Sequence, residues 1–77
     1  MKIIFSDHAL TKMGQRKLSK ELVMGVVRNP DFISQSYNFR EERYKKFNKN
    51  HLKVVTIKEG EKTVVITVHW VAKFKIK

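Results

Sequence analysis

The sequence predicts an α+β domain in which two N-terminal helices cover one face of an antiparallel sheet of about four strands. Three observations predict this class: a short apolar strand pattern begins the chain, two serine-capped helical patterns follow it, and alternating apolar and polar residues fill the remainder. With 77 residues and no internal repeat or linker, the chain is expected to form a single small domain over 1–77.

The two helices are predicted from their caps and their apolar spacing. Residues 7–17 follow Ser6 and residues 20–28 follow Ser19, and a serine is a favoured residue immediately before a helix. The second helix is expected to end at 29–30, because the residue before a proline disfavours helical geometry. The side chains expected to pack inward are Ala9, Leu10 and Met13 in the first helix and Leu22, Val23, Val26 and Val27 in the second.

The strands are predicted from runs of alternating residues that turn signals separate. A short strand is expected at 2–5, and the main sheet strands are expected at 31–38, 43–48, 51–59 and 64–76. The mixed polarity of 31–38 is typical of an edge strand. Tight turns are expected at 48–50 and 59–61.

Strict alternation makes the last strand the clearest element. Its even-numbered residues from 64 to 76 are all apolar and predict one buried face: Val64, Ile66, Val68, Trp70, Ala72, Phe74 and Ile76. A straight strand of this length would exceed roughly 40 Å, so we expect either a bend or bulge near 70–72 or a C-terminal tail that pairs with another chain.

The charge balance points to polyanions. Lys and Arg number 17 against 7 acidic residues, giving a formal net charge of +10 and an isoelectric point near 10.2. RNA or DNA is the first expected partner and an acidic protein the second, whereas a membrane is not expected. The chain contains no cysteine and no apolar run that could span a bilayer, which fits a cytoplasmic protein.

A stripe of nitrogen-bearing side chains runs along the first predicted helix. His8, Lys12 and Arg16 follow one another at four-residue intervals and therefore lie within about 80° on one face. A histidine beside two fixed positive charges is suited to handling a phosphodiester. The alternative is a solvated basic surface in which the histidine has no function.

Further candidate RNA ligands lie in the predicted strands. Basic residues alternate with aromatic ones between 37 and 49, namely Tyr37, Phe39, Arg40, Arg43, Tyr44, Lys45, Lys46, Phe47 and Lys49, a mixture that suits single-stranded RNA. On the last strand, the polar face is expected to carry Thr67, His69, Val71 and Lys73. The spacing of the three histidines predicts no metal site, and no cofactor is expected.

An ordered set of short motifs resembles a known prokaryotic family. The motifs are Ser6-Asp7-His8-Ala9, Met13, Arg16, Leu18-Ser19, Asn29-Pro30-Asp31, Arg43-Tyr44, Val54-Val55 and Val65-Ile66-Thr67-Val68. The set resembles domain of unknown function 4258 over nearly the whole chain. The sequence departs from the family pattern at Lys12, where arginine is usual, and at Lys17, where glycine is usual.

That family is similar to the barnase, colicin and RelE-like ribonuclease superfamily, whose members include toxins of toxin–antitoxin systems. The resemblance implies a RelE-like α+β fold and metal-independent RNA cleavage. By motif position it carries over His8, Arg16, Arg43 and Thr67.

On this basis we expect a cytoplasmic endoribonuclease toxin that leaves 2′,3′-cyclic phosphate ends and binds an acidic antitoxin. Its expected catalytic residues are His8, as general base, with Arg16, Arg43 and His69. The expected RNA-binding residues are Lys12, Arg40, Tyr44, Lys45, Lys46, Thr67 and Lys73. A non-catalytic nucleic-acid-binding module and a domain that docks an acidic protein are the alternatives, and the sequence leaves open mRNA or tRNA as the target and a monomer or homodimer as the assembly.

Overall fold

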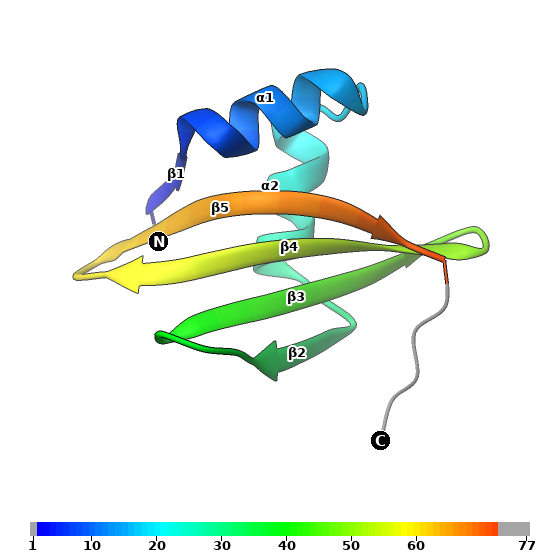
Figure 1. Cartoon of the computed structure of the whole chain (residues 1–77). Helices are drawn as coiled ribbons and strands as arrows, with labels where there is room; N and C mark the ends of the chain where they lie inside the picture. Colours follow the sequence, from blue (N-terminus) through cyan, green and yellow to red (C-terminus); the bar gives the residue numbers. More distant parts are fainter. Residues whose placement is uncertain (1, 73–77) are drawn as a thin grey trace.

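A computed structural model describes residues 2–72 and confirms the α+β class (Figure 1). A strand and two helices precede four further strands. The elements are β1 (Lys2–Phe5), α1 (Asp7–Gln15), α2 (Lys20–Arg28), β2 (Phe32–Gln35), β3 (Arg40–Phe47), β4 (Asn50–Glu59) and β5 (Lys62–Val71). The last four residues of the predicted final strand, 73–76, which include Lys73, lie outside the described residues.

The strands form one mixed sheet rather than a purely antiparallel one. Its order is β1-β5-β4-β3-β2, and the four strands from β2 to β5 pair antiparallel as predicted, with β2 at an edge. The difference is β1, which pairs in parallel with the first half of β5. Residues 2–5 are too few for their alternation to indicate a partner, so the sequence left the place of this strand undetermined.

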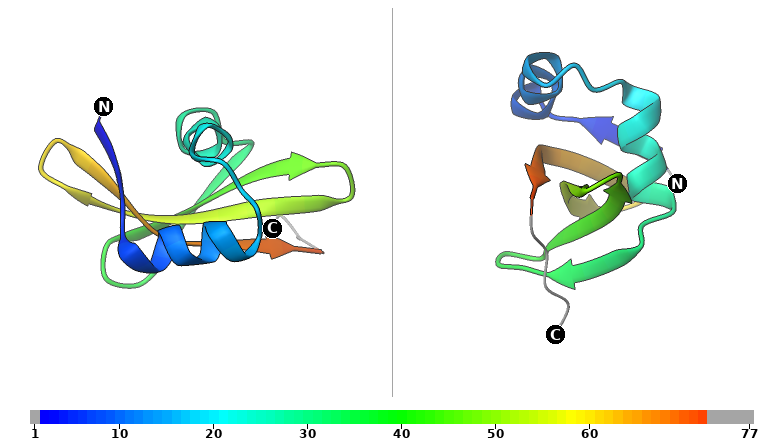
Figure 2. Two further views of the ribbon diagram at one scale, coloured as in Figure 1. Left: turned by 90° about the horizontal axis from the view of Figure 1, so that it is seen from above. Right: turned by 90° about the vertical axis from the view of Figure 1, so that its right-hand side faces the viewer.

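The two helices take different positions on the sheet. Both views in Figure 2 place α2 against one face of the sheet, whereas α1 runs alongside β5 at the edge of the sheet. The expectation that both helices cover one face is therefore correct only for α2. The two helices still share one core with β4 and β5, made by Ala9, Met13, Val23, Val26, Val27, Leu52, Val54, Val65 and Val68.

The observed burial corrects the prediction for one side chain of α1. Leu10 was expected to pack inward, but it is 40% exposed. It lies on the solvent side of α1 because the helix packs at the sheet edge through the narrower stripe of Ala9 and Met13.

The N-terminus of α1 is fixed to a bulge in β5. The Ser6 side chain accepts a hydrogen bond from the Ala9 amide at 3.1 Å, which confirms the predicted cap. Its hydroxyl also donates to the Ile66 carbonyl at 3.0 Å, and its amide donates to the Val65 carbonyl at 3.0 Å. These bonds determine which part of β5 the helix follows.

The bulge also corrects the predicted buried face of β5. Thr67 pairs with Val55 and Val65 with Thr56, so Ile66 is an extra residue and the alternation shifts by one. Val68 is buried as an even-numbered residue, but before the bulge the buried residues are Thr63 and Val65. A bend or bulge was expected near 70–72: the structure has a bend at Ala72, and it adds a bulge at Ile66 that was not predicted.

The resemblance implies a glycine at the position of Lys17, and the C-terminus of α1 gives a physical reason for it. Lys17 has φ 56°, in the left-handed region. Its amide donates to the Gly14 carbonyl at 3.3 Å, and the Leu18 amide donates to the Met13 carbonyl at 2.9 Å. This pair of bonds is the Schellman motif, which glycine usually completes because it has no Cβ.

We therefore predict that Lys17→Gly stabilises the protein. Relieving the left-handed strain at a helix end should raise the free energy of unfolding by about 0.5–1 kcal/mol. Urea unfolding followed by circular dichroism measures the effect, and Lys20→Gly in the first turn of α2 is a control that should destabilise. An unchanged or lower midpoint for Lys17→Gly would contradict the strain assigned to this residue.

Candidate functional site

The sheet face opposite α2 carries the candidate site, and we call it the open face. The side chains of Arg43 and Lys45 lie on the α2 face, because they donate hydrogen bonds to the main-chain carbonyls of Val27 and Asn29 at the end of α2. Strand alternation then identifies the residues of the open face. Tyr44 between them therefore lies on the open face. Register then places Lys53 opposite Tyr44, and His69 opposite Lys53, in one row across three strands.

The α1 stripe meets the β5 end of this row. Burial lowers the pKa of His69, and the positive charges of Lys53, Arg16 and Lys12 and the neighbouring His8 lower it further. Each of these groups is thus close enough to His69 to act on it electrostatically. We call His8, Lys12, Arg16, Lys53 and His69 the basic cluster.

His8, Lys12 and Arg16 all act on His69, so they share one side of α1, as their four-residue spacing predicts. Lys12 and Arg16 are half-buried, whereas His8, in the first turn, is exposed. His69 is also half-buried, and it was expected on the polar face of its strand. The structure brings the two histidines into one cluster, which helical and strand periodicities cannot predict separately.

A carboxylate borders the cluster on the side of β3. Glu42 accepts a hydrogen bond from the Tyr44 hydroxyl at 3.0 Å, and the Lys53 ammonium lies 3.6 Å from its other oxygen. Burial, together with the bond to Glu42 and the charge of Glu42, raises the pKa of Tyr44 to about 12. Tyr44 is therefore a neutral donor that holds Glu42, and Glu42 in turn holds Lys53 beside His69.

Thr67 lies on the same face next to this row. Thr67 pairs with Val55, and Lys53, the next residue of β4 on the same face, pairs with His69. The Thr67 hydroxyl is buried, and it has no hydrogen-bond partner within residues 2–72. Its expected place among the RNA-binding residues stays a prediction.

Arg43 and Lys45 are not part of the cluster, although both were expected to contact RNA. The Arg43 guanidinium donates to the Val27 carbonyl at 2.7 Å and to Glu41 at 2.8 Å, on the α2 face. Lys45 donates to the Asn29 carbonyl at 3.1 Å and lies 3.8 Å from Asp31. The sheet therefore separates both residues from His8 and His69, and their bonds join the end of α2 to β3.

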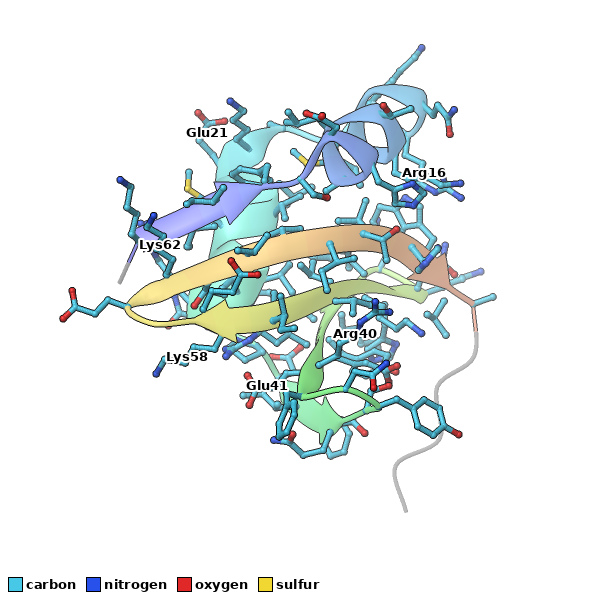
Figure 3. All side chains as sticks on the ribbon, turned by 60° about the vertical axis from the view of Figure 1, so that its left-hand side comes forward. Arg16, Glu21, Arg40, Glu41, Lys58 and Lys62 are labelled. Carbon is cyan, nitrogen blue, oxygen red and sulfur yellow. The ribbon has the colours of Figure 1, made fainter. Side chains whose placement is uncertain are left out.

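Two further predicted ligands do lie on the open face. Arg40 and Lys46 alternate with Arg43 and Lys45 along β3, and both are exposed. Figure 3 shows Arg16 and Arg40 on one side of the sheet, while Glu41 and Lys58 point to the other.

Sequence reasoning missed Lys53 and Glu42. Lys53 interrupts an otherwise apolar stretch of β4, and that interruption was the available signal. Glu42 carried no such signal, because its neighbours in β3 are also charged and only the register places it beside Lys53.

The described residues carry no group of three or more His, Cys, Asp or Glu side chains that could hold a metal ion. Neither described helix is long and apolar enough to cross a membrane.

Comparison with known proteins identifies the family of the chain. No curated protein and no solved structure matches the sequence. Residues 5–70 match the family described as Domain of unknown function (DUF4258), and the match covers α1, α2 and nearly all of the sheet. This match confirms the resemblance that the ordered motifs indicate, and the chain therefore belongs to the DUF4258 family.

Proposed function

We propose that the protein is a metal-independent endoribonuclease, the toxin of a toxin–antitoxin pair, and that it acts in the cytoplasm. The observation that carries the proposal is the basic cluster, in which one further histidine and three cations from α1 and β4 lie close enough to His69 of β5 to lower its pKa, at the edge of the open face. RNA supplies its own nucleophile, the 2′-hydroxyl, so a base, an acid and fixed positive charge are sufficient for cleavage.

In this proposal His69 is the general base. Its lowered pKa keeps the imidazole neutral at neutral pH, and a neutral imidazole can accept the 2′-hydroxyl proton. The 2′ oxygen then attacks phosphorus, and the bond from phosphorus to the 5′ oxygen breaks. His8 gives a proton to that leaving oxygen, so His8 acts as the general acid rather than as the general base that the sequence suggested.

The three cations of the cluster stabilise the charge on the phosphorane. Lys12 and Arg16 approach from α1 and Lys53 from β4, so the phosphate would be held between a helix and a strand. Glu42 keeps Lys53 in place through their ion pair at 3.6 Å.

The net charge of the chain and the order of its helices and strands also support this proposal. The formal charge of +10 attracts RNA and also suits an acidic antitoxin that neutralises it. The order of one strand, two helices and four antiparallel strands fits the RelE-like ribonucleases that the family resembles.

Cleavage of a defined RNA in EDTA tests the proposal. We expect fragments ending in 2′,3′-cyclic phosphate from RNA and no fragments from a matched strand with 2′-deoxyribose throughout. Equal cleavage of the two strands would rule out the 2′-hydroxyl as nucleophile. Salt-sensitive binding without cleavage would favour the non-catalytic binding module.

The pH dependence of cleavage provides a second prediction. Because a protonated His69 cannot act as base, activity should fall as the pH drops through its pKa, which lies below that of a free histidine. Removing a neighbouring cation in Lys53→Met raises this pKa, so the acidic limb of the rate profile should move to higher pH.

The His69 ring signal in an NMR titration should show the same shift, independently of activity. Lys58→Met on the same strand is the matched control, because Lys58 points away from the open face (Figure 3). Identical profiles for Lys53→Met and the wild type would contradict the role of His69 as base.

A further inference from the structure

The turn between β2 and β3 displays two aromatic rings to solvent. Tyr37 is 86% exposed and Phe39 is 90% exposed, the highest values among the exposed large hydrophobic residues of the described chain. The other aromatic rings of β2 and β3 are packed, for example Phe32 against Tyr44 with ring centroids 6.1 Å apart. The turn therefore exposes aromatic surface that the core does not use.

The backbone holds these rings on a short, hydrogen-bonded turn. The Ser36 amide donates to the Arg40 carbonyl at 2.8 Å, and the Arg40 amide donates to the Tyr37 carbonyl at 3.1 Å. Asn38 and Phe39 have φ 56° and 62°, which lie in the left-handed region. A bulky residue is unusual there, and glycine would fit the turn with less strain. Strain of this kind is concentrated at functional sites.

The turn lies on the same side of the sheet as the basic cluster. Both panels of Figure 2 show the β2–β3 turn projecting on the side opposite α2. Arg40 directly follows Phe39, and its side chain lies on the same side as Arg16 (Figure 3). Two strand spacings of about 4.8 Å and four residues of about 3.3 Å separate Arg40 from His69 by roughly 16 Å.

We propose that Tyr37 and Phe39 form a stacking site for bases of single-stranded RNA, a few nucleotides along the strand from the cleaved phosphate. Arg40 binds the phosphate of the stacked nucleotide. The inference rests on the proposed function, because it takes RNA as the substrate, and it adds that this RNA is single-stranded and crosses the open face diagonally.

Chemistry favours RNA bases over other occupants of the turn. A stacking site for RNA needs flat exposed rings next to a cation that binds the phosphate backbone of the RNA. Tyr37 and Phe39 supply the rings and Arg40 the cation, all within four residues. The bases of a duplex are stacked on each other and do not reach such rings, so the site selects unpaired RNA. The net charge of +10 provides the attraction that brings a polyanion to this face.

Binding of an uncleavable strand tests the site separately from cleavage. The probe is a 2′-O-methyl RNA of about ten nucleotides, which lacks the nucleophile, and its Kd is measured by fluorescence anisotropy. Phe39→Leu and Tyr37→Leu keep apolar surface but lose the flat ring, and each should raise Kd by about 5- to 150-fold. Phe39→Trp should bind as tightly as the wild type.

A matched control uses Ile33→Ala. Ile33 is an exposed hydrophobic residue of β2 at 44%, and it lies on the α2 side opposite Arg43. Its substitution should leave Kd unchanged. Circular dichroism of every variant confirms that the turn substitutions leave the fold intact.

Abasic probes locate the stacked nucleotide. Removing one base at a time from the 2′-O-methyl strand should weaken wild-type binding at one or two positions, and removing the base that stacks on Phe39 should have no effect on Phe39→Leu. If Kd depends on the removed base in the wild type but not in Phe39→Leu, stacking is supported even when the wild type cleaves no RNA. The stacking site and the ribonuclease activity can therefore fail separately.

An unchanged Kd for both leucine variants would overturn the stacking site. If these variants also showed altered self-association in size-exclusion chromatography, the rings would be assigned to contact between copies of the chain.

Discussion

Replacing His69 with alanine should lower kcat/KM for RNA cleavage by a factor of about 10²–10⁴, the usual contribution of a general base. The imidazole is half-buried between α1 and β4, where burial and the charges of Lys53, Arg16 and Lys12 lower its pKa.

The matched control is His51→Ala. His51 lies two residues before Lys53 on β4 and therefore also on the open face, but it is not among the groups that lower the pKa of His69. Its substitution should change kcat/KM by less than about threefold, far below the factor of roughly 10²–10⁴ expected for loss of a general base. A large loss in both variants would indicate a general effect on RNA binding.

Chemical rescue separates proton transfer from structure. His69→Gly leaves space beside a half-buried position, and added imidazole should restore part of the cleavage rate in proportion to its neutral form. Binding of a 2′-O-methyl strand should be almost unchanged in this variant, because the three cations remain. Loss of binding together with cleavage, and no response to imidazole, would contradict a catalytic role for His69.

The elements of the fold were largely predictable because local chemistry determines them. The caps Ser6 and Ser19 bond to Ala9 and Leu22 as their positions imply, and Pro30 follows the end of α2. The parallel pairing of β1 with β5 and the bulge at Ile66 were not predicted. The parallel pairing joins residues sixty positions apart, as does the bond from Ser6 to Ile66 at the bulge, and no local pattern contains such contacts.

The candidate site was predictable on the helix and not on the sheet. Four-residue spacing brings His8, Lys12 and Arg16 together in any α-helix, and the structure keeps them together. For β3, alternation shows that Arg43 and Tyr44 lie on opposite faces but not which face a helix covers. Assigning Arg43 to the site therefore required knowledge of where α2 packs.

Arg43 provides the second large expected effect, which is on stability. Arg43→Ala should lower the free energy of unfolding by about 1.5–3 kcal/mol, because hydrogen bonds to a charged group are lost and their partners stay desolvated. The lost bonds join the guanidinium to the Val27 carbonyl at 2.7 Å and to Glu41 at 2.8 Å, and the Arg43 side chain is only 16% exposed. Thermal unfolding should show a lower Tm by about 4–8 °C for each kcal/mol.

Two further variants define the cause. Arg43→Lys retains the charge but cannot reach both acceptors with a planar fork, so it should lie between the wild type and Arg43→Ala. Lys46→Ala, at an exposed position of the same strand, should change Tm little.

Cleavage by these variants distinguishes the two roles considered for Arg43. Measured well below the Tm of each variant, kcat per folded molecule should match the wild type, because the guanidinium lies across the sheet from His69 and binds the end of α2. A stable Arg43→Ala protein that had lost cleavage would instead place Arg43 at the phosphate, as the family resemblance implied, and would require β3 to present its other face to the RNA. The α2 contact makes stability the expected readout, since the positive charge of Arg43 already satisfies a carbonyl of the last turn of that helix.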